Sequence, residues 1–229
     1  MTMYFIRGAC LCFAFLGFQH MMAQENFTGL FQPKIAVNYE VSDNYKHNFS
    51  IAQRNYFYQN EVFGITTRQI DLVHFSNLKV KDDQSIALGI QYRIRENFEV
   101  DKLNELRFTQ QYNITHKPRN VRFGHRFRAQ QRITSALTVH RFRYRFAIDF
   151  PLSGEQLDVG EPYLIVNTEA LLSVARTKLP QYDQRISANI GWLVAPKTKL
   201  QAGLQYRIED YTHQTRFEFF IHTNLIVAL

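Results

Sequence analysis

The stretch SIALGIQYRIR, residues 85–95, determines the fold class. Large apolar side chains such as Ile86 and Leu88 alternate with small or cationic ones such as Gly89 and Arg93. Successive side chains of a β-strand point to opposite faces, so this period of two predicts a strand with one apolar face and one small or cationic face. Helical spacing appears nowhere in the chain with comparable strength.

The same period continues through most of the chain, with Arg alternating with Phe and Tyr. The other alternating segments cover residues 34–41, 46–58, 66–79, 105–114, 121–132, 141–149, 163–174, 185–194, 200–209 and 216–227. Turn-forming residues separate them, as at 117–120 and 195–197. We count eleven strands, but single-chain bacterial barrels use even numbers, so we expect 12 strands, with 10 as the alternative.

The length of these segments indicates which face meets the solvent. Strands of soluble proteins usually have about 5 or 6 residues, whereas a tilted strand that crosses a membrane needs about 9 to 11. Most segments here alternate for about ten residues or more, and no apolar run reaches the roughly 18 residues of a membrane-spanning helix. We therefore expect an all-β, up-and-down antiparallel transmembrane β-barrel. Aromatic girdles at its two membrane interfaces would include Tyr92, Tyr112, Tyr144, Tyr163 and Tyr206.

The cationic face then lines a polar, Arg-rich lumen. The expected lumen-lining residues are Arg93, Glu105, Arg107, Arg122, Arg126, Arg128, Arg132, Arg141, Arg143, Arg145, Glu169, Arg207, Glu209, Arg216 and Glu218. Arg outnumbers the acidic residues on this face, and an unpaired charge in a dry interior would be prohibitive. The excess predicts internal water or an anionic ligand.

The first 23 residues have the pattern of a secretory signal peptide. Arg7 supplies a positive charge, residues 8–18 are apolar, and Ala23 supplies the small residue at a cleavage site. We expect cleavage after Ala23 and a single barrel domain at 24–229. Cys10 and Cys12 both lie in the leader, so the mature chain would have no disulfide, zinc-thiolate site or cysteine nucleophile.

Composition narrows the function further. The chain has 229 residues, 27 Lys and Arg against 20 Asp and Glu, and 45% hydrophobic residues, which excludes a disordered protein. A basic chain with Arg among aromatics could bind nucleic acid, but export argues against that partner. No His spacing suits a metal, and no Gly-rich loop suits a nucleotide, so we expect no metal and no cofactor.

Several blocks also carry a family resemblance. ALGIQYRIR (87–95), ELRFTQQY (105–112), HRFRAQQR (125–132), RFRYRF (141–146) and LQYRIEDY (204–211) resemble an uncharacterised bacterial family, domain of unknown function 2490. The resemblance covers most of the mature chain and implies a small outer-membrane β-barrel of Gram-negative bacteria. It implies no activity and no catalytic residues. Such barrels often end in Phe, whereas this chain ends in Leu229.

Three classes of function stay open. The leading interpretation is a non-enzymatic barrel of the bacterial outer membrane, either structural or a narrow, porin-like, anion-preferring channel. The second is an outer-membrane lipid-modifying enzyme, for which His125, His140 and Ser135 are the candidates. The third is a soluble periplasmic barrel that binds an anionic ligand. The expected partners are outer-membrane lipids and, during biogenesis, the barrel assembly machinery; the sequence gives no oligomeric state.

Overall fold

The computed structural model describes residues 27–229, which form eleven β-strands. The strands are β1 (Phe27–Ser42), β2 (Tyr45–Gln59), β3 (Val62–Lys81), β4 (Gln84–Ile94), β5 (Glu105–His116), β6 (Arg122–Ile133), β7 (Thr138–Pro151), β8 (Pro162–Ala175), β9 (Lys178–Ala195), β10 (Thr198–Glu209) and β11 (Arg216–Ala228). No helix in the described residues is long and apolar enough to span a membrane. The expected signal peptide and its cleavage site lie outside the described residues.

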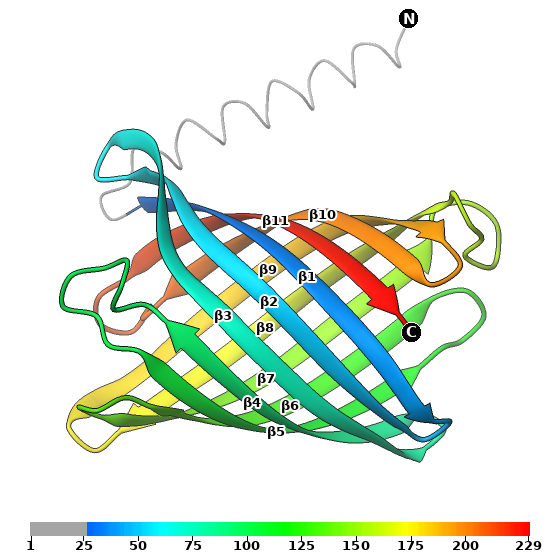
Figure 1. The fold of residues 1–229 in the computed structure, drawn as a ribbon, viewed down its shortest axis with the longest axis horizontal. Coiled ribbons are helices and arrows are strands. Elements are labelled where there is room, and N and C mark those ends of the chain that lie inside the picture. Colours follow the sequence, from blue (N-terminus) through cyan, green and yellow to red (C-terminus); the bar gives the residue numbers. More distant parts are fainter. Residues whose placement is uncertain (1–26) are drawn as a thin grey trace, which may run out of the picture.

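The eleven strands close into one barrel (Figure 1). Neighbouring strands are antiparallel except β1 and β11, which run parallel where the sheet closes, with Ile35 opposite Leu225. Strand direction alternates around an up-and-down barrel, so an odd number of strands brings the first and last together in the same direction. The expected count of 12, or 10, is wrong. Each alternating segment forms one strand, and the parallel β1–β11 pair allows closure with an odd number.

The odd count also places Phe27 and Ala228 at opposite ends of the barrel (Figure 1). We call the end where β1 begins the N-terminal rim and the end where β11 finishes the C-terminal rim. Five of the ten connections are two-residue turns. The longest are residues 95–104, at the N-terminal rim, and 152–161, at the C-terminal rim.

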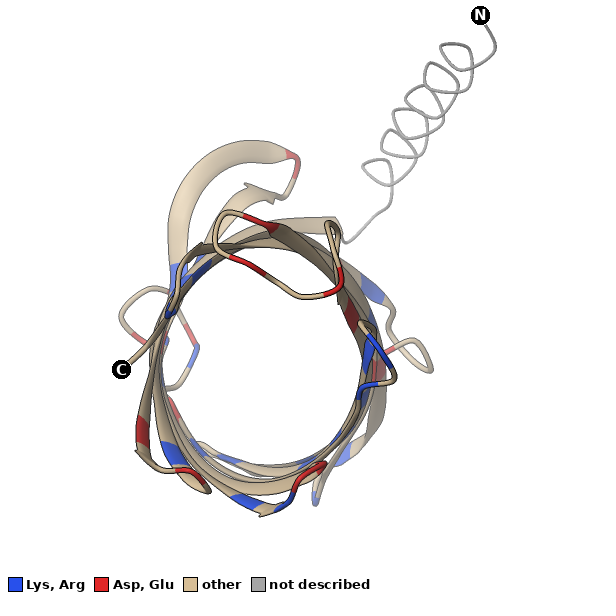
Figure 2. Ribbon diagram, turned by 90° about the vertical axis from the view of Figure 1, so that its right-hand side faces the viewer, with Lys and Arg blue, Asp and Glu red and all other residues tan. Residues whose placement is uncertain are grey.

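The two faces of the wall have opposite chemistry. On the outer face Leu88, Ile186 and Leu204 are 66%, 56% and 50% exposed. On the inner face, polar side chains such as Arg107 and Asp183 are buried. The orientation expected from the alternation, apolar outside and polar inside, is therefore present in the structure. Figure 2 shows the closed ring along its axis, with basic and acidic residues distributed around the wall.

Two glycines make room for aromatic rings inside the barrel. A Cβ at Gly89 would lie 2.3 Å from the Phe75 ring, and one at Gly191 would lie 2.2 Å from the Tyr163 ring. Tyr163 is only 6% exposed and its hydroxyl accepts a hydrogen bond from Gln201. Its expected place in an outer aromatic girdle is wrong, because it lies an even number of residues before lumen-facing side chains of β8 and shares their face.

At the N-terminal rim the β2–β3 hairpin bends outward, away from the barrel wall (Figures 1 and 2). Its turn residues Asn60 and Glu61 have φ of 52° and 64°, as a two-residue type I′ turn requires. Register shifts follow Arg54 and Tyr56, so the strict period of two is interrupted before the strands reach the tip. This interruption changes which residues of β2 and β3 face the lumen.

Candidate functional site

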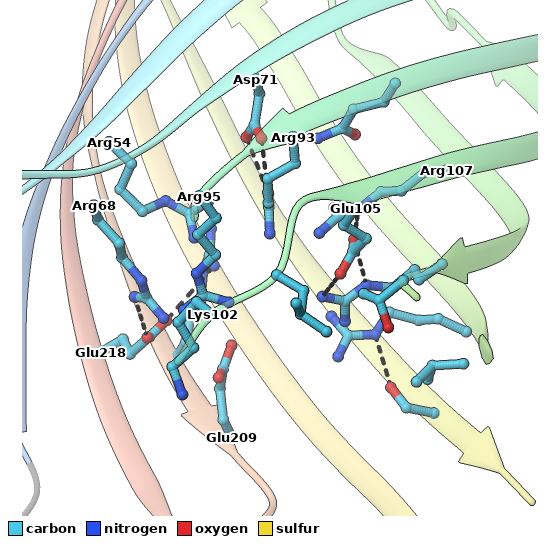
Figure 3. Close-up of a pocket in the computed structure, with 18 of the residues that line it drawn as sticks. Arg54, Arg68, Asp71, Arg93, Arg95, Lys102, Glu105, Arg107, Glu209 and Glu218 are labelled. Carbon is cyan, nitrogen blue, oxygen red and sulfur yellow. Dashed lines mark hydrogen bonds and ion pairs between the residues drawn. The ribbon is translucent and has the colours of Figure 1, made fainter. Parts of the chain in front are cut away.

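A cavity of about 940 Å³ occupies the lumen from the middle of the barrel to the N-terminal rim (Figure 3). Charged and amide side chains form most of its wall, from Lys34 on β1 to Glu218 on β11. The loop 95–104 contributes Glu99 and Lys102 to the lining. Because all the strands present alternate side chains inward, residues far apart in sequence meet in this one space.

Arg and carboxylate side chains alternate around the N-terminal part of the cavity, in what we call the paired network. Every guanidinium in it has a nitrogen within 4.0 Å of a carboxylate oxygen. Its members are Arg68, Asp71, Arg93, Arg95, Glu99, Glu105, Arg107, Arg132, Arg141, Asp183, Arg185, Arg207, Glu209 and Glu218.

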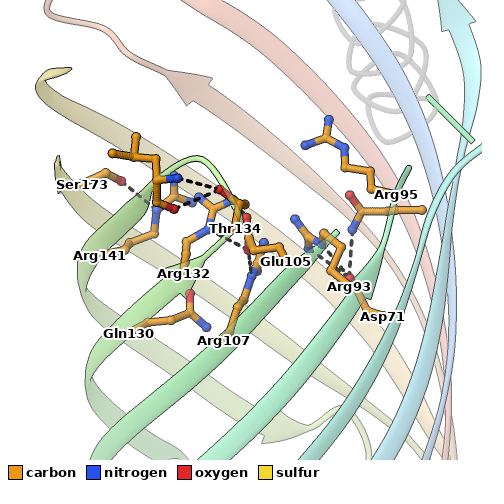
Figure 4. A network of polar contacts seen from close by, with 12 residues as sticks. Asp71, Arg93, Arg95, Glu105, Arg107, Gln130, Arg132, Thr134, Arg141 and Ser173 are labelled. Carbon is orange, nitrogen blue, oxygen red and sulfur yellow. Dashed lines mark hydrogen bonds and ion pairs between the residues drawn. The ribbon is translucent and has the colours of Figure 1, made fainter. Parts of the chain in front are cut away.

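Glu105 shows how this network compensates its charges (Figure 4). Arg107 and Arg132 lie directly opposite each other on β5 and β6, where like charges repel. Arg107 donates from Nε to Glu105, and Arg132 donates from Nε and Nη2 to the two Glu105 oxygens at 3.0 and 2.9 Å. The carboxylate therefore converts a repulsive pair into a hydrogen-bonded triad.

Asp71 has the same role between β3 and β4. Arg93 donates from Nε to Asp71 Oδ1 at 2.7 Å and from Nη2 to Oδ2 at 3.0 Å, a bidentate pair. Gln69 adds a third hydrogen bond to this carboxylate at 2.9 Å. Both charged side chains are buried, so each depends on the other for compensation.

Beside the paired network, an aromatic ring contacts two Arg guanidinium groups. Phe220 is fully buried inside the barrel in a small apolar cluster with Leu30 and Tyr56. The Cζ atoms of Arg207 and Arg54 lie 3.6 and 4.9 Å from the Phe220 ring centroid, within the range of cation–π contacts. Arg54 has no carboxylate within 4 Å in the described chain, and this ring helps to compensate its charge.

Glu99 fixes the loop 95–104 to the barrel wall. Its oxygens accept hydrogen bonds from the Tyr56 hydroxyl at 2.6 Å and from Arg95 Nε at 2.5 Å, and Arg68 Nε lies 3.9 Å away. Burial favours the neutral acid, but the hydrogen bonds and the two positive charges outweigh burial and hold the pKa of Glu99 below its ordinary 4.5. The loop is thus held by an ionised carboxylate.

Five further cations lie near the middle of the barrel, and we call them the cation band: Lys34 on β1, Arg126 and Arg128 on β6, and Arg143 and Arg145 on β7. Within the described chain, only Arg143 of these five lies within 4 Å of a carboxylate, 3.7 Å from Glu169. Glu169 is shared with Arg185, which lies 3.4 Å away. Glu169 also interacts electrostatically with Arg126, Arg128 and Arg145, so one carboxylate serves all four Arg residues of the band and the band keeps an excess of positive charge.

In the band, the Arg side chains donate hydrogen bonds to amide oxygens, which carry no net charge. In the paired network, the Arg side chains contact carboxylates instead. Arg126 Nε donates to Asn113 at 2.9 Å. Arg128 donates to Gln111 through Nε and Nη2, and Arg143 Nη2 donates to Gln130 at 2.9 Å. These hydrogen bonds orient the guanidinium groups without neutralising them.

The strand register brings the band's Arg residues into direct opposition. Arg126 lies opposite Arg145 in the register of β6 and β7, and two residues further along β6 Arg128 lies opposite Arg143. All four side chains face the lumen, and we call each opposed Arg–Arg pair a rung. Like charges directly opposite each other destabilise a sheet by roughly 0.2–1 kcal/mol per pair. Two adjacent repulsive rungs are a cost to folding, and an anion held between them would remove it.

The structure brings most of the sequence-predicted residues together. Those that line the cavity are Arg93, Glu105, Arg107, Arg128, Arg132, Arg141, Arg143, Arg207, Glu209, Arg216 and Glu218. Arg126, Arg145 and Glu169 lie beside them at the level of the band. Arg122 is separate: it pairs with Asp149 near the C-terminal rim and its side chain is 53% exposed.

Sequence reasoning missed several members of the site: Lys34, Arg54, Arg68, Asp71, Arg95, Glu99, Asp183 and Arg185. Arg54 and Arg68 flank the register shift between β2 and β3, where the alternation gives no consistent face. Glu99 belongs to a loop and has no periodic signal. Asp71 could have been found, because it is an acid between Ile70 and Leu72 within an apolar-alternating segment.

The residues considered for lipid hydrolysis do not form a catalytic pair. His125 Nδ1 lies 2.9 Å from the Tyr144 hydroxyl, and no serine in residues 27–229 is hydrogen-bonded to His125 or His140. Ser135 lies in the β6–β7 turn. Over the same residues, no group of three or more His, Asp or Glu is placed to hold a metal ion.

Comparison with known proteins identifies a family. No curated protein matches the sequence. Two solved structures that share some likeness are of in-vitro folded OmpT, an outer membrane protein of Vibrio cholerae. Its trimer form is 8% identical with a TM-score of 0.42, over 75% of this chain and 78% of that one. The second is 9% identical with a TM-score of 0.42, over 75% and 77%. Residues 33–218 match the family model described as "Protein of unknown function (DUF2490)", so the chain belongs to this family, as the sequence blocks predicted.

Proposed function

We propose that this protein is a β-barrel of the bacterial outer membrane whose lumen forms a narrow, anion-preferring passage. The outer wall supports the location, because exposed Leu, Ile, Val and aromatic side chains continue around it. Soluble monomers rarely expose contiguous apolar patches of more than a few hundred Å². The closed barrel pairs its backbone groups from strand to strand, which a chain surrounded by lipid requires.

The cation band carries the proposed anion preference. Rings of Arg and Lys lining a lumen favour anions, since each passing ion meets a local excess of positive charge. The band has five cations and shares one carboxylate with Arg185. Eleven strands make a barrel narrower than the 16- to 18-stranded porins, so such a passage would admit small solutes.

Reversal potentials test this proposal. The purified barrel would first be shown to reach the outer-membrane fraction and to change gel mobility on boiling, and would then be inserted into a planar bilayer under a KCl gradient. We expect the current to reverse toward the chloride equilibrium potential. The double variant Arg126→Gln/Arg145→Gln should bring the reversal potential closer to zero, whereas Arg176→Gln, in an exposed turn, should leave it unchanged. A cation preference, or no current at all, would reject the passage.

The two alternative functions have less support. A lipid-modifying enzyme would need a His–Ser pair, and His125 is instead bonded to Tyr144. A soluble periplasmic barrel would bury its apolar face, whereas here that face points outward. Recovery of the protein from the soluble periplasm, without a heat-dependent change in gel mobility, would favour the soluble barrel.

A further inference from the structure

We propose that the cation band is a binding site for a doubly charged phosphoryl group, carried by free phosphate or by a phosphomonoester. The proposal rests on the proposed function of the lumen and names the class of anion that the passage holds. Three features of the band support it: donors without acceptors, paired guanidinium groups at fixed spacing, and an adjoining cavity.

The band has more hydrogen-bond donors than acceptors. In the described chain, Lys34 and Arg145 donate no side-chain hydrogen bond to another side chain, and Arg126 uses only its Nε, toward Asn113. Arg143 Nε is buried and has no acceptor. Buried N–H groups are nearly always paired in folded proteins, so Arg143 Nε is open to a further acceptor. Arg68 Nε, Arg107 Nη2 and Arg185 Nε of the paired network are likewise unpaired, and the band differs from the network in its shortage of carboxylates.

The spacing of the free donors suits an oxyanion with several oxygens. The rungs Arg126–Arg145 and Arg128–Arg143 are two residues apart along each strand, or about 7 Å. Lys34, on β1, interacts electrostatically with Arg126, Arg128 and Arg145, so a third strand adds positive charge to the band. An anion between the rungs would be met by guanidinium groups from two strands and by an ammonium from a third.

Guanidinium chemistry favours phosphate over the other common anions. Arg presents a planar fork of N–H groups that matches two oxygens of a phosphate or carboxylate at once. Chloride has one charge and no such geometry, and a single carboxylate has only two oxygens for the two rungs. A phosphoryl dianion supplies three or four oxygens and two charges, and so fits four Arg and one Lys best.

The adjoining cavity can hold an organic group attached to the phosphoryl. Arg128, Arg143 and Lys34 line the cavity of about 940 Å³, so the band forms its inner end. The Arg128 guanidinium is fixed in place by the Phe75 ring, with 5.3 Å from Cζ to the ring centroid. A small phosphorylated solute could therefore bind with its phosphate in the band and its uncharged part in the cavity.

Calorimetric titration of the detergent-refolded barrel tests the site at constant ionic strength in a chloride background. The probes are inorganic phosphate, glucose 6-phosphate and, as a neutral control, glucose. We expect the wild type to bind at least one phosphoryl probe and not glucose. Arg126→Gln/Arg145→Gln should lower this affinity about a hundredfold, because two charge-assisted contacts are lost. Lys34→Gln should lower it more modestly, and Arg176→Gln should have no effect.

The outcomes separate this proposal from the proposed passage. Binding of inorganic phosphate alone identifies the free ion as the ligand, and binding of glucose 6-phosphate identifies a phosphomonoester. Absence of binding, or equal binding by the double variant with its heat-dependent gel mobility intact, overturns the site even if the passage conducts chloride. Retained phosphate binding without any bilayer current would instead support the site and reject the passage.

Discussion

The paired network and the cation band both contain Arg side chains on neighbouring strands, but carboxylates compensate these charges in the network far more than in the band. In the network, Arg107 and Arg132 face each other across β5 and β6, and Glu105 bridges them. In the band, Arg128 and Arg143 face each other across β6 and β7, and no carboxylate is hydrogen-bonded to both; Glu169 lies 3.7 Å from Arg143 alone of the two. The difference indicates which part of the lumen maintains the barrel and which part is available to a ligand.

The two regions differ in the groups that accept hydrogen bonds from Arg, which are amides in the band and carboxylates in the network. Gln111 and Gln130 accept hydrogen bonds from Arg128 and Arg143, as Glu105 does from Arg132. A carboxylate both orients and neutralises a guanidinium, whereas an amide only orients it. The charges of the network are therefore compensated within the barrel, whereas the Arg side chains of the band are oriented but keep an excess of positive charge.

The largest expected effect comes from removing a carboxylate of the network. Glu105→Gln would leave Arg107 and Arg132 opposed and buried without compensation, and should lower the free energy of unfolding by about 3 kcal/mol. Urea titration followed by the fluorescence of the single tryptophan, Trp192, measures this loss. Glu155→Gln, in the exposed loop 152–161, is the matched control. A loss no larger than that of the control would contradict the role assigned to the network.

A smaller effect is expected at the edge of the network, where Glu99 holds the loop 95–104. The pKa of Glu99 is lowered on folding, so its contribution is fully present above the ordinary value of 4.5 and is lost as pH falls through the folded value. The protection of this loop against hydrogen exchange, taken relative to the intrinsic exchange rate at each pH, should fall on acidification from pH 6 to pH 3 by an amount equivalent to about 1 kcal/mol.

Glu99→Gln should show low protection at both pH values, because the amide cannot supply the negative charge that Arg68 and Arg95 bind. If the variant loop exchanged as slowly as the wild type at pH 6, the ion pairs would not be what holds it.

The smallest expected effect has the opposite sign and lies in the band. Arg145→Gln removes the repulsion with Arg126 and should raise the free energy of unfolding by about 0.5 kcal/mol in the absence of phosphate. The same urea titration applies, with Arg176→Gln as the control for loss of one positive charge. Destabilisation by Arg145→Gln would show that the band, like the network, is compensated within the barrel.

The alternation of side chains predicted the barrel, the outward apolar face and most of the lumen charges, because a period of two translates directly into two faces. The strand count was wrong because pairing of β1 with β11 depends on closure of the sheet, which no local pattern encodes. Arg54 and Arg68 were missed because a bulge changes the face of a residue without changing its type. Opposition of Arg128 and Arg143 requires the register between two strands, which the sequence does not state.

The most direct test of the contrast between network and band is to give the band a carboxylate. Gln130→Glu would place a negative charge where Arg143 Nη2 already donates at 2.9 Å, and so would reproduce in the band the arrangement around Glu105. Reversal potentials under a KCl gradient would be compared for the wild type, Gln130→Glu and the exposed-loop control Gln156→Glu. We predict that Gln130→Glu moves the reversal potential toward zero while the control matches the wild type. An unchanged anion preference in Gln130→Glu would contradict the account.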